Sequence, residues 1–201
     1  MASSTKATTR GVTSGPTVDW VNPGNIVSSN NVYTTASLSY GSVLTEVSDY
    51  IRADYFGFDI PEFATIDGIV CSLERKASAA NVIQDYAVSI LKNGSVPAGS
   101  DDKKYTLGYW PSFDATINYG SASDLWGTTW TPADINHINT GFGVRAEYMP
   151  GYGSATAYVD YMEMTVYYTL NGIKHGATSV GRIYHGSTII KAIYHGSTQI
   201  G

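Results

Sequence analysis

The chain has 201 residues, of which 14% are charged, and its formal net charge is −5. Charged residues make up about 25% of an average soluble domain, so this composition, with 21 glycines and 16 tyrosines, favours short strands and many turns over long solvated helices. The negative charge argues against nucleic-acid binding, which needs a basic face, and no apolar run reaches the roughly 18 residues of a membrane span.

The N-terminal segment "MASSTKATTRGVTSGP" is small and polar, and it lacks the apolar centre of a secretory signal. We expect residues 1–17 to form a flexible arm, ordered only where it lies on a neighbouring subunit. The single cysteine, Cys71, cannot form an internal disulfide. Packing or oligomerisation must therefore stabilise the fold.

Residues 18–170 contain strand-sized segments of alternating character separated by turn signals. The side chains expected on one face of each segment are Ile51, Ala53 and Tyr55 in the first, Ile69, Cys71 and Leu73 in the second, and Tyr86, Val88 and Ile90 in the third. Gly57 suggests a bulge, and Asn93-Gly94 is a strong signal for a tight hairpin turn.

The segment 141–170 predicts two strands joined by a turn around Pro150-Gly151. Strict alternation in the second strand puts one set of side chains on a single face: Tyr158, Asp160, Met162, Met164, Val166 and Tyr168. Before these strands, "TPADINHI" predicts a short helix, with Thr131 as its cap, Pro132 in the first turn and Asp134 near the N-terminus.

These elements predict an all-β fold, a jelly-roll-like antiparallel β-sandwich over residues 18–170. Residues 171–201 form a second, small domain of short β-hairpin repeats. The repeats "IKHGATSV", "IYHGSTII" and "IYHGSTQI" begin at Ile173, Ile183 and Ile193, ten residues apart. A hairpin this short cannot bury its own apolar residues, so we expect units or chains to stack, which favours a homo-oligomer and in particular a trimer.

The repeats place His175, His185 and His195 in register. Imidazole is a common transition-metal ligand, so these histidines are candidates for a metal site. The repeats contain no Cys, Asp or Glu to complete one, and the favoured interpretation is that each histidine hydrogen-bonds near its turn or packs on a tyrosine. We expect no metal and no cofactor.

Candidate carboxylate pairs for glycoside hydrolysis are Asp59 with Glu62, Asp101 with Asp102, and Asp160 with Glu163. The second pair lies in a polar loop, and the third falls on opposite strand faces unless a bulge intervenes. No nucleophile, zinc-protease or phosphate-loop motif is present. We therefore expect no catalytic residues and no enzyme activity.

A set of aromatic residues offers either a glycan site or material for the core and for subunit interfaces. Its members are Tyr109, Trp110, Tyr119, Trp126, Trp130, Tyr148 and Tyr152. Core and interface roles are the favoured interpretation, because the number of aromatic residues does not by itself identify a ligand site.

The repeat "IYHGSTIIKAIYHGSTQI" resembles the short Ile-Tyr-x-Gly-Ser-Thr repeats that end many tailed-bacteriophage tail and head-appendage proteins. "VDWVNPGNIVSSNNVYTTA", "YFGFDIPEFATIDGI", "YGSASDLWGTTWTPADIN" and "YVDYMEMTVYYT" resemble a β-sandwich module of phage structural proteins.

This resemblance implies a non-enzymatic virion protein, made in the host cytoplasm, that contacts capsid, collar or tail proteins as a capsid decoration or head/tail appendage. An alternative is a receptor-binding tail protein that recognises host-surface glycan. A tail component that cleaves polysaccharide is a third possibility.

Overall fold

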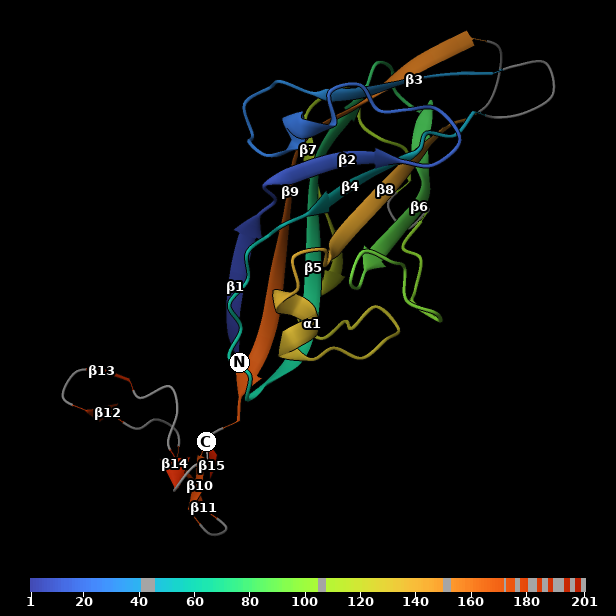
Figure 1. Cartoon of the computed structure of the whole chain (residues 1–201). Helices are drawn as coiled ribbons and strands as arrows, with labels where there is room; N and C mark the ends of the chain where they lie inside the picture. The colour runs from blue at the N-terminus through green and yellow to red at the C-terminus, as the bar shows by residue number, and fades with distance from the viewer. Residues whose placement is uncertain are drawn as a thin grey trace.

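The computed structural model describes residues 1–40, 46–104, 108–149 and 153–171, together with six short strand segments between residues 173 and 199. Two antiparallel sheets pack face to face (Figure 1). The five-stranded sheet contains β1 (Ala2–Ala7), β3 (Thr34–Tyr40), β5 (Ala64–Ala77), β7 (Ala115–Ser121) and β9 (Gly153–Leu170). The four-stranded sheet contains β2 (Arg10–Ser14), β4 (Tyr50–Asp54), β6 (Ile83–Leu91) and β8 (Gly141–Tyr148). The predicted all-β, jelly-roll-like antiparallel sandwich is confirmed.

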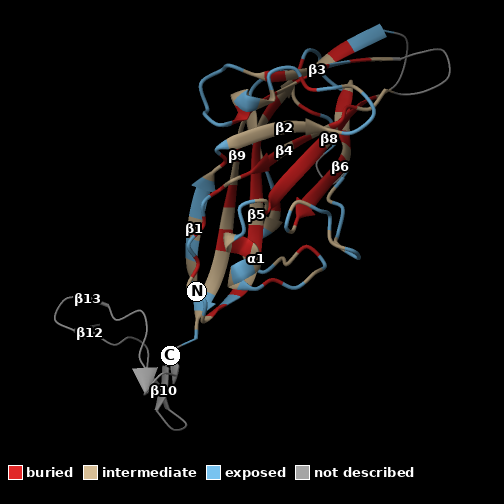
Figure 2. Cartoon of the chain, in the orientation of Figure 1, coloured by how far each residue is buried: buried red, intermediate tan, exposed pale blue. Residues whose placement is uncertain are grey.

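The core lies between the two sheets, where buried residues line the facing strands (Figure 2). Most of the predicted inward residues are buried, namely Ile51, Ala53, Ile69, Cys71, Leu73, Val88 and Ile90. Tyr86 and Tyr55 are only half-buried. Tyr86 lies at a bulge, because Asp85 pairs with Ala146 and Ala87 with Arg145. Tyr55 follows the last residue of β4 and has a positive φ of 60°.

A second bulge, in β9, overturns the alternation predicted for that strand. Val159 pairs with Arg75 and Tyr161 pairs with Glu74, so Asp160 is an extra residue with no partner in β5. The bulge moves the inward face from odd to even positions, and the buried apolar residues are Ala155, Ala157 and Val159 before it, and Met162, Met164 and Val166 after it. Tyr158 and Met162 therefore do not share a face.

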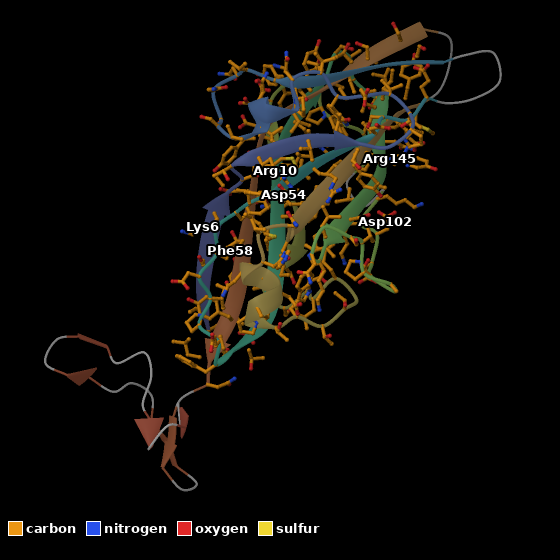
Figure 3. The ribbon with its side chains drawn as sticks, in the orientation of Figure 1. Lys6, Arg10, Asp54, Phe58, Asp102 and Arg145 are labelled. Atoms are coloured by element: carbon orange, nitrogen blue, oxygen red, sulfur yellow. The ribbon has the colours of Figure 1, made fainter. Side chains whose placement is uncertain are left out.

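The N-terminal segment is folded into the sandwich, which corrects the flexible arm expected over residues 1–17. Strand β1 pairs with β9, and β2 pairs with β4 in the other sheet. The Arg10 guanidinium donates to both oxygens of Asp54 at 2.5 Å (Figure 3). The buried Thr8 hydroxyl donates to the Asp54 carbonyl at 2.6 Å. Backbone pairing, which needs no apolar side chains, orders this polar segment.

The connection from β8 to β9 leads from one sheet to the other, since β8 pairs with β4 and β6 while β9 pairs with β1, β3 and β5. The expected turn at residues 150–152 lies outside the described residues. The predicted tight turn at Asn93-Gly94 is confirmed, because both residues have positive φ and the backbones of Lys92 and Ser95 exchange hydrogen bonds.

The predicted short helix is α1 (Pro132–Asn136). Thr131 and Asp134 form a reciprocal capping box, in which the Asp134 N–H donates to Thr131 Oγ1 and the Thr131 N–H donates to Asp134 Oδ2. A 3₁₀ helix, η1 (Pro23–Ile26), precedes β3. No helix in the described part of the chain is long and apolar enough to span a membrane.

The C-terminal repeats form the predicted two-stranded hairpins. Their strand pairs are β10 (Ile173–His175) with β11 (Thr178–Val180), β12 (Tyr184–His185) with β13 (Thr188–Ile189), and β14 (Tyr194–His195) with β15 (Thr198–Gln199). Each pair is antiparallel and recurs every ten residues. The turn glycines Gly176, Gly186 and Gly196 lie outside the described residues.

Candidate functional site

The aromatic residues that the sequence offered as a glycan site are mostly core residues. Trp110, Tyr119, Trp126, Trp130 and Tyr148 are all buried, so their rings are not available for stacking on an external ligand. Tyr109 is 40% exposed, and Tyr152 lies outside the described residues. The five buried members of this set are core residues, in line with the favoured interpretation.

Two of these buried aromatics surround an internal ion pair. Arg75 of β5 and Asp85 of β6 have no exposed side-chain surface, and Arg75 Nη1 donates to Asp85 Oδ1. Trp110 Nε1 donates to the same oxygen at 2.8 Å, and the Tyr119 hydroxyl donates to Asp85 Oδ2 at 2.8 Å. The Arg75 guanidinium carbon lies 4.7 Å from the centre of the Trp110 ring. Trp110 and Tyr119 thus hydrogen-bond to the carboxylate of the buried ion pair between the sheets.

The other two tryptophans bind backbone carbonyls. Trp126 Nε1 donates to the Ile69 carbonyl at 3.1 Å, and Trp130 Nε1 donates to the Leu125 carbonyl at 3.0 Å. Burying an indole requires a partner for its N–H. The first bond ties the segment 122–131 to β5, and the second lies within that segment.

Most of the candidate carboxylates are engaged by neighbouring groups of the chain. Asp160 Oδ2 accepts from the backbone N–H groups of Asn30 and Asn31 at 3.0 and 2.9 Å, whereas Glu163 Oε2 accepts from the Tyr161 hydroxyl at 3.3 Å. Asp102 accepts from the Val88 N–H at 2.8 Å. Asp101 is bound by Lys103, and Asp59 and Glu62 are exposed.

The side chains of His175, His185 and His195 lie outside the described residues. Their backbones pair with Thr178, Thr188 and Thr198 across each hairpin. Within the described ranges, no group of three or more His, Cys, Asp or Glu side chains could hold a metal ion.

The outer face of the four-stranded sheet carries a row of tyrosine and arginine side chains. Gly143 in β8 leaves space that Tyr50 fills, since its ring lies over that glycine and its hydroxyl is 3.2 Å from Ser89 on β6. The Arg145 guanidinium (Figure 3) lies 4.9 Å from the Tyr86 ring centre and donates to the Ser48 carbonyl. These long side chains contact one another and cover the sheet themselves.

A different surface combines an exposed aromatic ring with hydrogen-bonding groups. We call it the distal patch and define it by Tyr33, Lys76, Phe113, Asp114 and Tyr158. Phe113 is 69% exposed, the most exposed aromatic side chain in the described part of the chain. The patch is the candidate functional site.

The polar members of the distal patch hold one another in place. The Tyr33 hydroxyl lies 3.0 Å from Asp114 Oδ2, and Lys76 Nζ donates to the same oxygen at 3.2 Å. The Lys76 ammonium also lies 3.9 Å from the Tyr33 ring centre, a cation–π contact. Tyr33 and Tyr158 meet edge to face at 5.6 Å. Asp114 is adjacent to Phe113 in the chain, so these contacts fix the base of the exposed ring.

The loop that carries Tyr33 is fixed from below by the β9 bulge. The buried Asp160 carboxylate holds the backbone of Asn30 and Asn31, and Asn31 has a positive φ of 62°. The Val32 N–H donates to Asn30 Oδ1 at 3.0 Å. Asp160, the bulge residue that strict alternation along the strand does not reveal, therefore positions the Tyr33 loop of the distal patch.

At neutral pH Tyr33 is neutral and Lys76 is positive, as the ordinary pKa values of these groups require. Partial burial raises the pKa of the Tyr33 hydroxyl, and contact with Tyr33 raises the pKa of Lys76, so both shifts reinforce this charge state. The Asp114 carboxylate balances the Lys76 charge. The patch has charged groups but no net charge.

The distal patch lies where β5 ends. Lys76, the next-to-last residue of β5, is paired with Tyr158, whereas Ala64 at the start of β5 is paired with Leu170. Tyr158 and Leu170 are twelve positions apart, which corresponds to about 40 Å along the strand. The N-terminus is at the Leu170 end, because Ala2 pairs with Tyr168 (Figure 1).

No pattern in the sequence points to this site. Tyr33 and Phe113 each stand in a short polar stretch, "SSNNVY" and "PSFDA", and they are remote from each other in the chain. The one local signal is Asn30-Asn31, since asparagine tolerates positive φ and bonds to nearby backbone. The proximity of the two loops follows only from the sheet register.

Comparison with known proteins gives limited similarity. No protein-family model and no curated protein matches the chain. A solved structure described as "CBM4 structure and function" aligns with a TM-score of 0.38 and 12% identity, over 80% of this chain and 92% of that chain.

Proposed function

We propose that the protein is a non-enzymatic structural component of a bacteriophage virion, a capsid decoration or head/tail appendage that acts through protein–protein contacts. The observation that carries this proposal is the series of hairpin repeats that follows β9, at the end of that strand where β1 begins.

The hairpin repeats support a role in assembly. A two-stranded hairpin in isolation is marginally stable in water, and these hairpins have only two or three residues in each strand. Stacking between copies would supply the missing burial. We therefore propose a homo-oligomer, with a trimer favoured, held together through residues 171–201.

The ordered N-terminus changes which parts of the chain can make assembly contacts. Because β1 and β2 belong to the two sheets, the arm is not free to lie on a neighbour. Contacts with capsid, collar or tail proteins then involve the surface of the sandwich and the repeats.

The proposal is tested with particles of a phage that carries this gene and particles from which the gene has been deleted. Purified protein should attach to the deleted particles, and a cryo-electron microscopy difference map should locate it. A variant ending at residue 171 should remain folded but lose oligomerisation and attachment. If the full chain is absent from normal particles and attaches to none, the proposal is wrong.

A further inference from the structure

We infer that the distal patch, together with the neighbouring Asn31, binds an uncharged sugar. The Phe113 ring is the stacking platform, and the side-chain oxygens of Asn31 and Asp114 accept hydrogen bonds from the sugar hydroxyl groups. This inference goes beyond the virion role and does not depend on it.

Phe113 is the exposed apolar side chain of the distal patch. Its ring is 69% exposed on a domain that buries all four of its tryptophans. Covering such a ring with the C–H face of a pyranose removes apolar surface from water and gains free energy. Val32 is also exposed, at 52%, and belongs to the Tyr33 loop. Ligand sites typically combine such apolar surface with a few fixed polar groups.

The two loops that carry Tyr33 and Phe113 have more hydrogen-bond acceptors than donors to fill them. The Tyr33 hydroxyl lies 3.0 Å from both Asn31 Oδ1 and Asp114 Oδ2, but it has a single proton to donate. Asp114 Oδ1 accepts no hydrogen bond from the described residues. A ligand rich in hydroxyl donors satisfies these oxygens.

The charged groups of the distal patch pair with each other. The Lys76 ammonium is engaged by Asp114 and by the Tyr33 ring, so it offers little to an anion. An acidic ligand would meet the Asp114 carboxylate and be repelled, and a cationic ligand would compete with Lys76. The balanced pair therefore favours an uncharged ligand.

Hydrogen bonds to the sheet hold both loops of the distal patch in place. The Asn30 and Asn31 N–H groups are bound to the buried Asp160, and the Pro111 carbonyl accepts from the Ala77 N–H at 2.7 Å. Both loops of the distal patch are thus tied to β5 and β9. Groups that are already ordered lose little entropy when a ligand binds.

The same features fit a protein partner less well. A stable protein interface covers about 800 Å² on each side and has a largely apolar centre. Phe113 and Val32 are exposed large apolar side chains of the two loops around the patch, Val27 and Tyr109 are partly exposed at the starts of the same loops, and the other side chains of the patch carry polar groups. A small polar site with one platform suits a sugar.

The test uses the full chain and four probes: oligomers of glucose, oligomers of N-acetylglucosamine, oligomers of galactose, and purified host-surface polysaccharide. Binding is followed by amide chemical shifts in NMR spectra and by titration calorimetry. At least one probe should produce saturable shifts at residues 30–33 and 113–114. Phe113→Ala should weaken that binding by about tenfold or more, a typical loss for a central aromatic contact.

Two further variants sharpen the result. Tyr33→Phe keeps the ring and removes the one hydroxyl proton that the two acceptors share, so it should change affinity without unfolding the loop. Ile138→Ala removes an exposed apolar side chain outside the patch and should leave binding unchanged.

If no probe shifts these amides, or if Phe113→Ala binds as well as the parent, the inference is overturned. If no sugar binds and Phe113→Ala instead prevents attachment to phage particles, the patch is an assembly contact. That outcome also overturns the sugar site, while the virion proposal stands.

Discussion

Arg75 and Asp85 form an ion pair between the two sheets in which neither side chain has exposed surface. Trp110 and Tyr119 donate hydrogen bonds to the carboxylate, and the Trp110 ring lies beside the guanidinium. Arg75 Nε and Nη2 have no partner among the described residues. Burial raises the pKa of Asp85 against the opposing effect of Arg75 and the hydrogen bonds.

Removing one member of this pair should destabilise the domain strongly. Arg75→Met leaves a buried, uncompensated carboxylate, which costs about 3–5 kcal/mol in other proteins. The free energy of unfolding, measured by urea denaturation, should fall by that amount.

Lys76→Met is the matched control, because Lys76 is the next residue and its ion pair with Asp114 is partly exposed. It should cost less than about 1 kcal/mol. Equal losses for the two variants would show that Arg75 is not in a buried network.

The capping carboxylate of α1 should make stability depend on acid pH. Burial opposes the charged form of Asp134, but hydrogen bonds from Lys92 and Thr131 outweigh it and lower its pKa below 3.8. The unfolded chain then takes up this proton first, so the stabilisation is present above pH 3.8 and is lost as pH falls through the folded pKa. Asp134→Asn should cost about 1 kcal/mol at pH 7, and the difference from the parent should shrink below pH 3.8 in thermal denaturation. A constant difference would contradict this account.

The ordered N-terminus predicts resistance to proteolysis. Lys6 and Arg10 lie in β1 and β2, where the backbone is paired on at least one side. Trypsin should cleave after them no faster than the sandwich opens, as followed by mass spectrometry. A chain that begins at residue 8 should unfold at lower temperature, because its β9 edge is uncovered. Rapid removal of residues 1–6 with no change in melting temperature would restore the flexible arm.

Gly120 should not tolerate a side chain. Its φ is +85°, and a Cβ atom there would lie 2.2 Å from the Ile69 carbonyl oxygen. Gly120→Ala should cost about 2 kcal/mol or more through strain and displaced backbone. Gly24→Ala is the control, since nothing lies within 4 Å of the added atom. Similar unfolding midpoints for both variants would refute the close approach of β7 to β5.

Much of the fold could be predicted from local pattern. The alternation around Cys71 placed Ile69 and Leu73 in the core, and Thr131 with Asp134 identified the cap of α1. The ten-residue repeat that begins at Ile173, Ile183 and Ile193 identified the hairpins. In each case the determining residues are neighbours in the chain.

The errors came from interactions between distant residues. Whether Asp160 is an extra residue in β9 depends on how β5 pairs with it, which parity along one strand cannot show. The core role favoured for Trp110 holds, but its hydrogen bond to Asp85 could not be predicted, because Asp85 lies on another strand. The polar N-terminus lacked the apolar residues that usually mark a strand, and only its pairing with β9 and β4 orders it.

Strand β9 also gives the molecule a direction of mechanical strength. It continues for 18 residues from Gly153 to Leu170, hydrogen-bonded along one edge to β5 and along the other to β1 and β3. Antiparallel hydrogen bonds run perpendicular to the strand, so tension applied at Asn171 along β9 is shared by many of them at once. A load entering from the C-terminal repeats would be carried through the sandwich in shear, the geometry in which a β-sheet resists being pulled apart.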